Sequence, residues 1–215
     1  MTKAVLWDLD GTLVDSAEFH WRAWRDVMEE EGLPITHDQF VHSFGKRNDL
    51  ILAGWLGENA DPGRIRRLSE EKEGRFRALV LAHGIEPLPG VRAWVARLHA
   101  EGWAQAIATS APRANLEAMV DAMKLRHCFD ASVAAEDVTH GKPDPEVFLI
   151  AARRLGAEPT RSVVVEDAPI GIEAGRRAGM RTVGVSLLHT LPAADVHVGT
   201  LPELPADTFE RLLKR

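Results

Sequence analysis

Two pairs of carboxylates have a spacing that could carry chemistry. Asp8 and Asp10 stand two residues apart at the end of a short apolar run, and Glu166 and Asp167 directly follow the apolar run 162–165. Side chains at positions i and i+2 of an extended segment point the same way, so the first pair can converge. Carboxylates without histidine or thiol partners suit the hard ion Mg²⁺. The sequence therefore predicts a magnesium site, with turn and N-cap residues as the alternative interpretation of the first pair.

A second set of residues has the chemistry to hold phosphate. Thr109 and Ser110 end the apolar run 103–109, and Lys142 lies in a loop that contains prolines. Hydroxyl and backbone N–H groups at a strand-to-helix junction can hold phosphate oxygens, and a lysine balances the negative charge. Taken singly, Thr109 and Ser110 are also typical helix caps. The prediction of a phosphate site therefore depends on the whole set.

The elements that would position these residues alternate along the chain. Apolar runs that predict strands lie at 4–9, 103–109, 131–135, 162–165 and 182–185, and helical patterns lie at 91–101, 115–123, 145–155 and 170–178. Runs that are apolar on successive residues are typical of strands buried on both faces of a parallel sheet. This order predicts an α/β fold with a doubly wound, mostly parallel sheet, whose ligands bind beyond the carboxyl ends of the strands.

Residues 16–86 break this alternation, because they contain several helical patterns and no convincing strand. In the first pattern, apolar or aromatic residues such as Trp21 and Trp24 recur every three or four positions, which is the spacing of one helix face. The sequence therefore predicts an inserted α-helical cap domain of residues 16–86. The α/β core is expected to comprise residues 1–15 and 87–215.

Local signals add detail to this predicted insertion. Thr36 and Gln39 have the spacing of a capping box, which predicts the start of a helix. The pattern 64–81 predicts a long, strongly charged helix with a mostly solvated face. Lys72 within it is a candidate to reach the site, although a solvated side chain is the more common role of a lysine. The prolines of 86–90 predict the return hinge to the core.

Composition and charge limit the class of protein. The 215 residues include 26 Lys and Arg and 32 Asp and Glu, so the net charge is −6 and we expect no nucleic-acid partner. No uncharged apolar window of about 18 residues is present, so we expect no membrane partner. The single cysteine, Cys128, and the lack of an apolar leader predict a cytoplasmic protein. We expect a monomer or weak dimer, although the sequence does not fix the oligomeric state.

As a set, these motifs resemble those of the haloacid dehalogenase superfamily, in its phosphatase and β-phosphoglucomutase branch. The stretch DLDGTLVDS at 8–16 is similar to the first family motif, Thr109 in IATSA to the second, and Lys142 in HGKPDPE to the third. Glu166 and Asp167 in VVVEDAPIGIEAG are similar to the fourth. The resemblance covers essentially the whole chain, and the insertion lies where the family carries its helical cap.

The resemblance implies a Mg²⁺ cofactor and a covalent intermediate. Asp8 would be the nucleophile that becomes an aspartyl phosphate, and Asp10 would be the general acid and base. Asp8, Asp10 through its backbone carbonyl, and Asp167 would hold the Mg²⁺. Glu166 would complete this acidic set of metal residues.

The resemblance also implies the substrate class. Thr109 and Lys142 would hold the phosphate, with Ser110 beside them. We therefore expect a phosphatase that acts on a small phosphorylated metabolite, a sugar phosphate. The alternatives are a β-phosphoglucomutase and, less favoured, a non-catalytic binding or sensor module. Asp10 argues against dehalogenation, because the dehalogenase branch lacks the second carboxylate.

Within the predicted cap, three residues are candidates for substrate contact. The segment around His20 resembles the first cap helix of β-phosphoglucomutases, where a histidine is linked to proton transfer by the second aspartate. The alternative is a histidine packed on the apolar face of its helix. Lys46 and Arg47, in the segment 45–49, resemble the mutase loop whose arginine grips a second phosphate, although that arginine would fall at Asn48 here. The alternative interpretation of these two residues is exposed charge.

Overall fold

A six-stranded parallel sheet forms the centre of the computed structural model, which describes residues 2–43, 46–57, 59–187 and 189–214. The strands are β1 (Ala4–Trp7), β2 (Ala104–Ala108), β3 (Ala131–Val133), β4 (Ser162–Glu166), β5 (Arg181–Val185) and β6 (Val196–Val198). Their order is β3-β2-β1-β4-β5-β6, with parallel pairing throughout. The strand order reverses between β1 and β4, which is where this architecture binds ligands.

The doubly wound α/β fold class is confirmed, and five of the strands lie where the sequence predicts them. The sixth, β6, was not predicted. It has only three residues, two of them half-buried and one exposed, so no apolar run marks it. Its place at the edge of the sheet comes from pairing with β5, in which Gly184 lies opposite His197.

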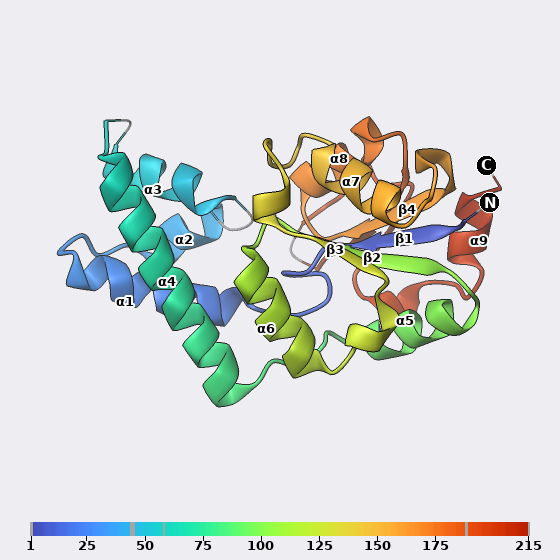
Figure 1. Ribbon diagram of the computed structural model, residues 1–215, viewed down its shortest axis with the longest axis horizontal. Helices are drawn as coiled ribbons and strands as arrows, with labels where there is room; N and C mark the ends of the chain where they lie inside the picture. The colour runs from blue at the N-terminus through green and yellow to red at the C-terminus, as the bar shows by residue number, and fades with distance from the viewer. Residues whose placement is uncertain (1, 44–45, 58, 188, 215) are drawn as a thin grey trace.

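Helices cover both faces of the sheet (Figure 1). One face carries α5 (Val91–Ala100), α6 (Arg113–Met123) and α9 (Thr208–Leu212), and the other carries α7 (Glu146–Arg154) and α8 (Pro169–Arg177). Within the part of the chain that the structure describes, no helix is both long enough and apolar enough to cross a membrane.

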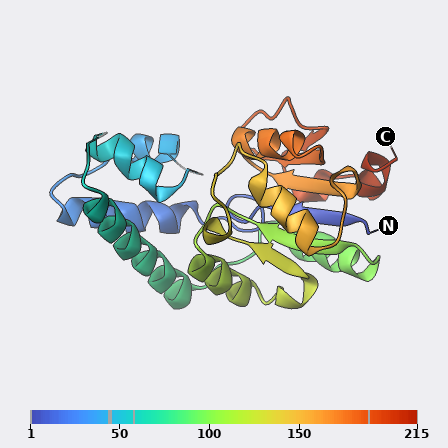
Figure 2. The same ribbon diagram turned by 45° about the horizontal axis from the view of Figure 1, so that its top comes forward.

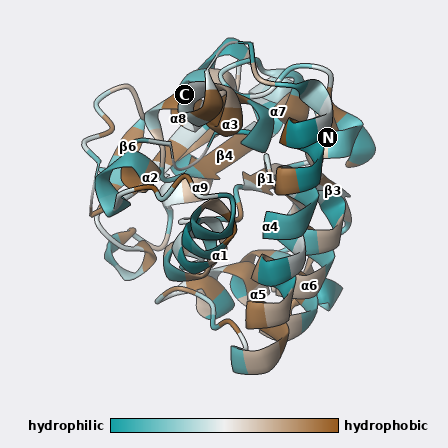
Figure 3. Cartoon of the chain, turned by 90° about the vertical axis from the view of Figure 1, so that its left-hand side faces the viewer, coloured by the Kyte–Doolittle hydropathy of each residue, from teal (hydrophilic) through white to brown (hydrophobic). Residues whose placement is uncertain are grey.

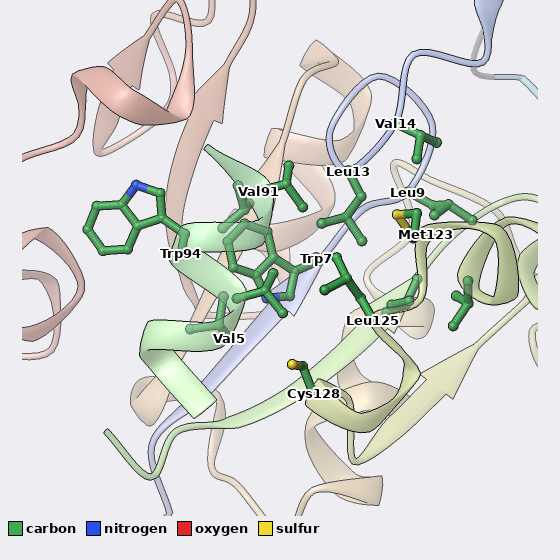
Figure 4. Packing of buried hydrophobic residues seen from close by; sticks show 14 of the residues in the cluster. Val5, Trp7, Leu9, Leu13, Val14, Val91, Trp94, Met123, Leu125 and Cys128 are labelled. Carbon is green, nitrogen blue, oxygen red and sulfur yellow. The ribbon is translucent and has the colours of Figure 1, made fainter. Parts of the chain in front are cut away.

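Side chains of β1 alternate between the two hydrophobic layers. Val5 and Trp7 belong to the cluster formed with α5, α6 and α9, part of which Figure 4 shows. Leu6 points the other way and packs with α7 and α8. Every residue of β1 is buried, as expected for a strand in the middle of a covered parallel sheet.

Four helices between β1 and β2 form a separate group, the cap: α1 (Ala17–Glu30), α2 (His37–Ser43), α3 (Asn48–Leu56) and α4 (Pro62–His83). The cap stands beside one end of the sheet instead of covering its faces (Figures 1 and 2). It has its own hydrophobic cluster, and Figure 3, which looks onto this end, shows hydrophilic residues along much of α4. An inserted helical cap is therefore confirmed, while the boundaries at 16 and 86 stay a prediction.

The start of α2 has the predicted capping box. The backbone N–H of Thr36 donates to Gln39 Oε1 at 2.7 Å, and the backbone N–H of Gln39 donates to Thr36 Oγ1 at 3.2 Å. Each side chain satisfies an N–H group that the helix itself leaves without a partner.

The two segments that connect cap and core lie side by side. One follows β1, and the other comprises residues 84–90. The backbone N–H of Leu88 donates to the carbonyl of Leu13 at 2.9 Å, and Val14 forms an isolated bridge with Pro87. This pairing ties the base of the cap to the loop that contains the first sequence motif.

Packing of α9 on the core predicts a large loss of stability in Phe209→Ala. The ring of Phe209 is 2 % exposed, and its centroid lies 6.2, 5.3 and 6.0 Å from those of Trp7, Trp94 and Trp103. The cavity should lower the free energy of unfolding in urea by about 3–5 kcal/mol. The exposed neighbour Arg211→Ala should change it by less than about 0.5 kcal/mol. A loss below about 1 kcal/mol in Phe209→Ala would contradict this packing.

Candidate active site

Three carboxylates converge where β1 and β4 end. The two strands are neighbours with Trp7 in register with Val165, so Asp8, the residue after β1, comes beside Glu166, the last residue of β4. Asp167 follows, and carboxylate oxygens of the three acidic residues lie within 4.8 Å of one another. The register of one strand pair thus brings together residues from opposite ends of the sequence.

Lys142 contacts this acidic cluster directly. Its Nζ donates to Asp8 Oδ1 at 2.5 Å, to Glu166 Oε1 at 2.7 Å and to the backbone carbonyl of Ala108 at 3.3 Å. The side chain is 4 % exposed, and Nζ lies 5.0 Å from the centre of the Phe148 ring. The loop before α7 therefore places a buried cation between two of the carboxylates.

Two glycines leave room for the acidic side chains. Gly11 has a φ of +84°, which favours glycine, and a Cβ there would lie 2.2 Å from Asp167 Oδ2. A Cβ on Gly171, in α8, would lie 1.8 Å from Glu166 Oε1. Both distances are far shorter than a van der Waals contact. Glycine at these two positions lets the backbone approach the carboxylates closely.

Burial makes ionisation of the acidic cluster costly. Burial raises the pKa of Asp8 well above its usual value, and Lys142 opposes this while Glu166 and Asp167 add to it. Burial and the charge of Glu166 also raise the pKa of Asp167 to about 8. Burial alone would lower the pKa of Lys142, but the charges of Asp8 and Glu166 outweigh burial and raise it. One lysine therefore offsets only part of the negative charge.

The composition of the cluster fits a hard divalent cation. Its donor atoms are carboxylate oxygens, which Mg²⁺ prefers, and a divalent ion would supply the positive charge that Lys142 alone does not. Of the four residues predicted to hold metal, the structure brings together the side chains of Asp8, Glu166 and Asp167. The fourth, Asp10, places its carboxylate elsewhere.

The Asp10 carboxylate faces the cap. Its Oδ1 accepts a hydrogen bond from Ser16 Oγ, and His20 Nε2 lies 3.2 Å from the same oxygen. Burial raises the pKa of Asp10, but the hydrogen bond and charge of His20, the Ser16 hydroxyl and the charge of Lys72 outweigh burial and lower it. A metal contact of Asp10 stays a prediction that concerns its backbone carbonyl.

His20 has features of both interpretations of its sequence position. It is 9 % exposed and its ring stacks on Phe76, with centroids 4.0 Å apart, as a packed histidine would. It also faces Asp10, and its Nδ1 lies 2.7 Å from Lys72 Nζ. With lysine as the donor, Nδ1 is the acceptor, so the ring proton is on Nε2 and faces Asp10.

Of the two interpretations of Lys72, the preferred one, a solvated side chain, is wrong. Lys72 is 2 % exposed, and its Nζ donates to Glu73 Oε1 at 2.8 Å as well as to His20. Aromatic rings of α1 and α4 also surround Nζ, at 5.2 and 5.6 Å from their centroids. Packing of α1 against α4 thus replaces water around the ammonium, a tertiary effect that a charged helix pattern does not reveal.

The predicted phosphate residues lie at the end of β2. Thr109 is 2 % exposed, and its Oγ1 accepts from the backbone N–H of Ala111 at 3.0 Å, which leaves the hydroxyl hydrogen to donate elsewhere. Ser110 lines the pocket described below. Sequence reasoning missed Thr12, whose Oγ1 donates to Asp167 Oδ1 at 3.3 Å. Its position inside the first motif was the available signal.

A cavity of about 370 Å³ lies between cap and core. Asp10 and Ser110 line it on the core side, and Lys46 and Arg47 line it on the cap side. This volume suits a small ligand. Both basic residues thus face the pocket, whereas Gly45, which begins the predicted cap loop, lies outside the described residues.

Comparison with known proteins gives matches along most of the chain. The model of the haloacid dehalogenase-like hydrolase family matches residues 5–185. The fructose-1-phosphate phosphatase of Escherichia coli strain K12 is 37 % identical over 187 residues, covering 86 % of this chain and 96 % of that protein. The β-phosphoglucomutase of Bacillus subtilis strain 168 is 29 % identical over 208 residues, covering 94 % and 91 %.

A solved structure shares the arrangement of core and cap. The crystal structure of a mutant of CbbY from Rhodobacter sphaeroides, in complex with xylulose-1,5-bisphosphate, superposes with a TM-score of 0.87. Sequence identity is 27 %, and the match covers 95 % of this chain and 96 % of that chain. The similarity therefore extends over both the sheet and the inserted helices.

Close approach of α8 to Glu166 predicts that Gly171→Ala is destabilising. The added methyl group would overlap the carboxylate and displace it from Lys142, so the free energy of unfolding in urea should fall by about 1–3 kcal/mol. Gly74→Ala is the matched control, because a Cβ there has nothing within 4 Å in an exposed part of α4. That variant should gain about 0.5–1 kcal/mol. Equal stability of Gly171→Ala and wild type would contradict the predicted overlap.

The raised pKa of Asp167 predicts a pH-dependent stability without metal. The folded state holds this proton up to a pH of about 8, whereas the unfolded chain loses it near the usual 3.8. The stabilisation that the protonated Asp167 gives the folded state is therefore complete below pH 4 and is lost as the pH rises toward 8. In EDTA, unfolding free energies should fall between pH 5 and 8 by about 3–4 kcal/mol more in wild type than in Asp167→Asn.

Adding Mg²⁺ at pH 8 should reverse much of this loss in wild type, because an ion that binds the folded state stabilises it. The Asp167→Asn variant, with one carboxylate fewer, should respond less. Identical pH profiles of the two proteins in EDTA, or an equal response to Mg²⁺, would contradict the assignment of Asp167 to a metal-binding cluster.

Proposed function

The chain belongs to the haloacid dehalogenase-like hydrolase family, and from this premise we propose that it is a phosphatase of a small phosphorylated metabolite, a sugar phosphate. The reaction would pass through an aspartyl phosphate on Asp8. The observation that carries this proposal is the environment of Asp8, a buried carboxylate bonded to Lys142 within a group of acidic oxygens. Likeness to a fructose-1-phosphate phosphatase supports a sugar phosphate as the substrate.

In the first step, an oxygen of the Asp8 carboxylate forms a bond to phosphorus, and the ester P–O bond of the substrate breaks. The negative charge of a bound substrate phosphate would raise the pKa of Asp10, so that Asp10 takes up a proton and gives it to the departing alkoxide. Lys142 and the hydroxyl of Thr109 hold the phosphate oxygens. Lys142 bonds to Asp8 and to the carbonyl of Ala108, the residue directly before Thr109, which supports this shared role.

In the second step, water forms a bond to phosphorus and the bond to Asp8 breaks, which releases inorganic phosphate. Asp10 takes a proton from the attacking water and so returns to its starting form. His20, whose Nε2 lies 3.2 Å from Asp10 Oδ1, would keep this carboxylate turned toward the reacting atoms.

Mg²⁺ is the proposed cofactor, held by Asp8, Asp167 and the backbone carbonyl of Asp10. When bound, it would offset the negative charge of the phosphate and the carboxylates. Glu166 differs from the other acidic residues, because Oε1 accepts from Lys142 and Oε2 accepts from the backbone N–H of Ala168 at 2.9 Å. These bonds support a role for Glu166 in holding Lys142 beside the metal site.

The cap favours hydrolysis over a mutase reaction. A mutase has to bind a bisphosphate intermediate, so it needs a second anion site in the cap. The mutase-like pattern would place an arginine at Asn48, and here the Asn48 amide donates to Glu73 Oε1 at 2.6 Å. An amide that already donates to a carboxylate binds a second phosphate poorly.

A β-phosphoglucomutase is the second candidate. Lys46 and Arg66 line the cap side of the cavity, and their charges suit a second phosphate group. Likeness to the Bacillus subtilis β-phosphoglucomutase supports the same alternative. The two candidates differ in the fate of the phosphoryl group.

We also propose a cytoplasmic location and a monomer or weak dimer. The single cysteine, Cys128, is a buried free thiol, which fits a reducing compartment. Sedimentation analysis would measure the oligomeric state directly.

A screen of sugar phosphates with Mg²⁺ tests the proposed reaction. Fructose 1-phosphate, β-glucose 1-phosphate and glucose 6-phosphate would be supplied separately, and inorganic phosphate would be measured. We expect stoichiometric release of phosphate from at least one of them. Conversion of β-glucose 1-phosphate to glucose 6-phosphate, without net phosphate, would instead favour the mutase.

The variant Asp8→Asn should lose activity without unfolding. An amide is not a nucleophile toward phosphorus, so we expect kcat to fall by more than about a thousandfold. The side chain keeps its size, so thermal unfolding should stay cooperative, which serves as the control. Activity near that of wild type would reject Asp8 as the nucleophile.

A further inference from the structure

Glu73 is a buried carboxylate that has no part in the reaction steps above, yet it connects cap and core. Its side chain lies in α4 and is 8 % exposed. Oε2 accepts a hydrogen bond from Nδ2 of Asn115, in α6 of the core. Oε1 accepts from Lys72 Nζ at 2.8 Å and from Asn48 Nδ2 at 2.6 Å. One carboxylate therefore bonds to the core and to two parts of the cap.

Two residues of α4 form hydrogen bonds with the side-chain amide of Asn115, one with its nitrogen and one with its oxygen. It is fully buried, its Nδ2 donates to Glu73, and its Oδ1 accepts from Nη1 of Arg77 at 3.0 Å. Loss of these hydrogen bonds would cost free energy, unless water replaced the partners of the buried amide. These bonds exist only while α4 rests on α6, so they favour the closed arrangement of the cap on the core.

The opposite side of Glu73 leads to the reacting groups. Lys72 donates to His20 Nδ1 at 2.7 Å, and His20 Nε2 lies 3.2 Å from Asp10 Oδ1. We propose, on the basis of the function proposed above, that Glu73 is a positioning residue that couples closure of the cap to the placement of Asp10. Asn115 holds the carboxylate in the closed state, and the carboxylate holds Lys72 against His20.

Removing the charge of Glu73 should disturb this line of contacts. Because Glu73 also lines the cavity between cap and core, KM reports any direct contact with substrate. The Lys72 ammonium would then be buried without its carboxylate partner. A buried charge without a partner is costly in free energy, which favours movement of the side chain. Lys72 and His20 would move, and Asp10 would lose its orientation. A misplaced acid harms reactions in which the leaving group needs a proton and spares those in which it does not.

The test compares two leaving groups in Glu73→Gln. The sugar of fructose 1-phosphate leaves as an alkoxide, which needs the proton of Asp10. By contrast, p-nitrophenyl phosphate releases p-nitrophenolate, which is stable without a proton. With Mg²⁺ present, we expect kcat to fall about tenfold or more for fructose 1-phosphate and about threefold or less for p-nitrophenyl phosphate. KM should change little for either. Any sugar phosphate found to be the better substrate would replace fructose 1-phosphate.

The matched control is Glu31→Gln, which removes a carboxylate bonded to Arg64 and Arg67 within the cap. It should leave both reactions within about twofold of wild type.

Asn115→Leu should reproduce the selective loss of Glu73→Gln. The double variant should be no slower than the slower single variant, because the two residues act through the same contact. Equal losses for both substrates, or no loss in Glu73→Gln, would overturn the proposal.

Spin labels at the exposed positions Glu70, in α4, and Arg153, in α7, separate this proposal from the proposed function. We expect one narrow distance distribution in the otherwise unchanged protein and a longer, broader one after Glu73→Gln. If wild type hydrolyses neither substrate, the phosphatase proposal fails, and the label distances alone decide whether Glu73 holds the cap closed. An unchanged distribution in Glu73→Gln would overturn the coupling.

Discussion

The carboxylates of Asp8, Glu166 and Asp167 repel one another, and this repulsion is the constraint that the rest of the site has to meet. At 4 Å and an effective dielectric of 20, each pair of unit charges costs about 4 kcal/mol. A buried lysine, Lys142, bonds to two of the carboxylates and offsets part of their charge. The carboxylate oxygens are also suited to a divalent cation, and glycines at two positions leave room for the acidic side chains. A substrate phosphate adds further negative charge, so the same positive groups that hold the cluster together can also hold the substrate.

The second carboxylate of the first motif, Asp10, lies in a different environment from that of Asp8. Burial and acidic neighbours surround Asp8, whereas Asp10 faces His20 and the charge of Lys72 beyond it. Without a cation these surroundings favour a protonated Asp8 and an ionised Asp10, so the proposed roles of nucleophile and proton donor would depend on a bound Mg²⁺ and on the charge of the substrate phosphate. The strand β1 supplies both residues, but the cap supplies the partners of Asp10. In the proposed reaction, proton transfer by Asp10 would therefore depend on the position of the cap, whereas nucleophilic attack by Asp8 would depend on the sheet.

The fold and the central site could be predicted from the sequence because their signals are local. Five strands appear as apolar runs, and the chemistry of the site sits in short motifs at strand ends, where the parallel sheet gathers them. Burial of Lys72 could not be predicted, since it depends on how α1 packs against α4. The contact between Glu73 and Asn115 joins residues of two helices whose crossing no periodicity reveals. Local pattern thus indicates the candidate reacting groups, whereas tertiary packing decides which side chains surround them.

Capture of a phosphorylated Asp8 would test most directly whether this carboxylate accepts the phosphoryl group. Wild-type protein turning over a sugar phosphate with Mg²⁺ would be quenched in acid and treated with borohydride, which reduces an acyl phosphate to the alcohol. Peptide mass spectrometry should then find homoserine at position 8 and unchanged aspartate at position 10. Aspartate alone at position 8, in protein that releases phosphate at its full rate and under conditions that trap a known acyl phosphate, would contradict a covalent intermediate on this residue.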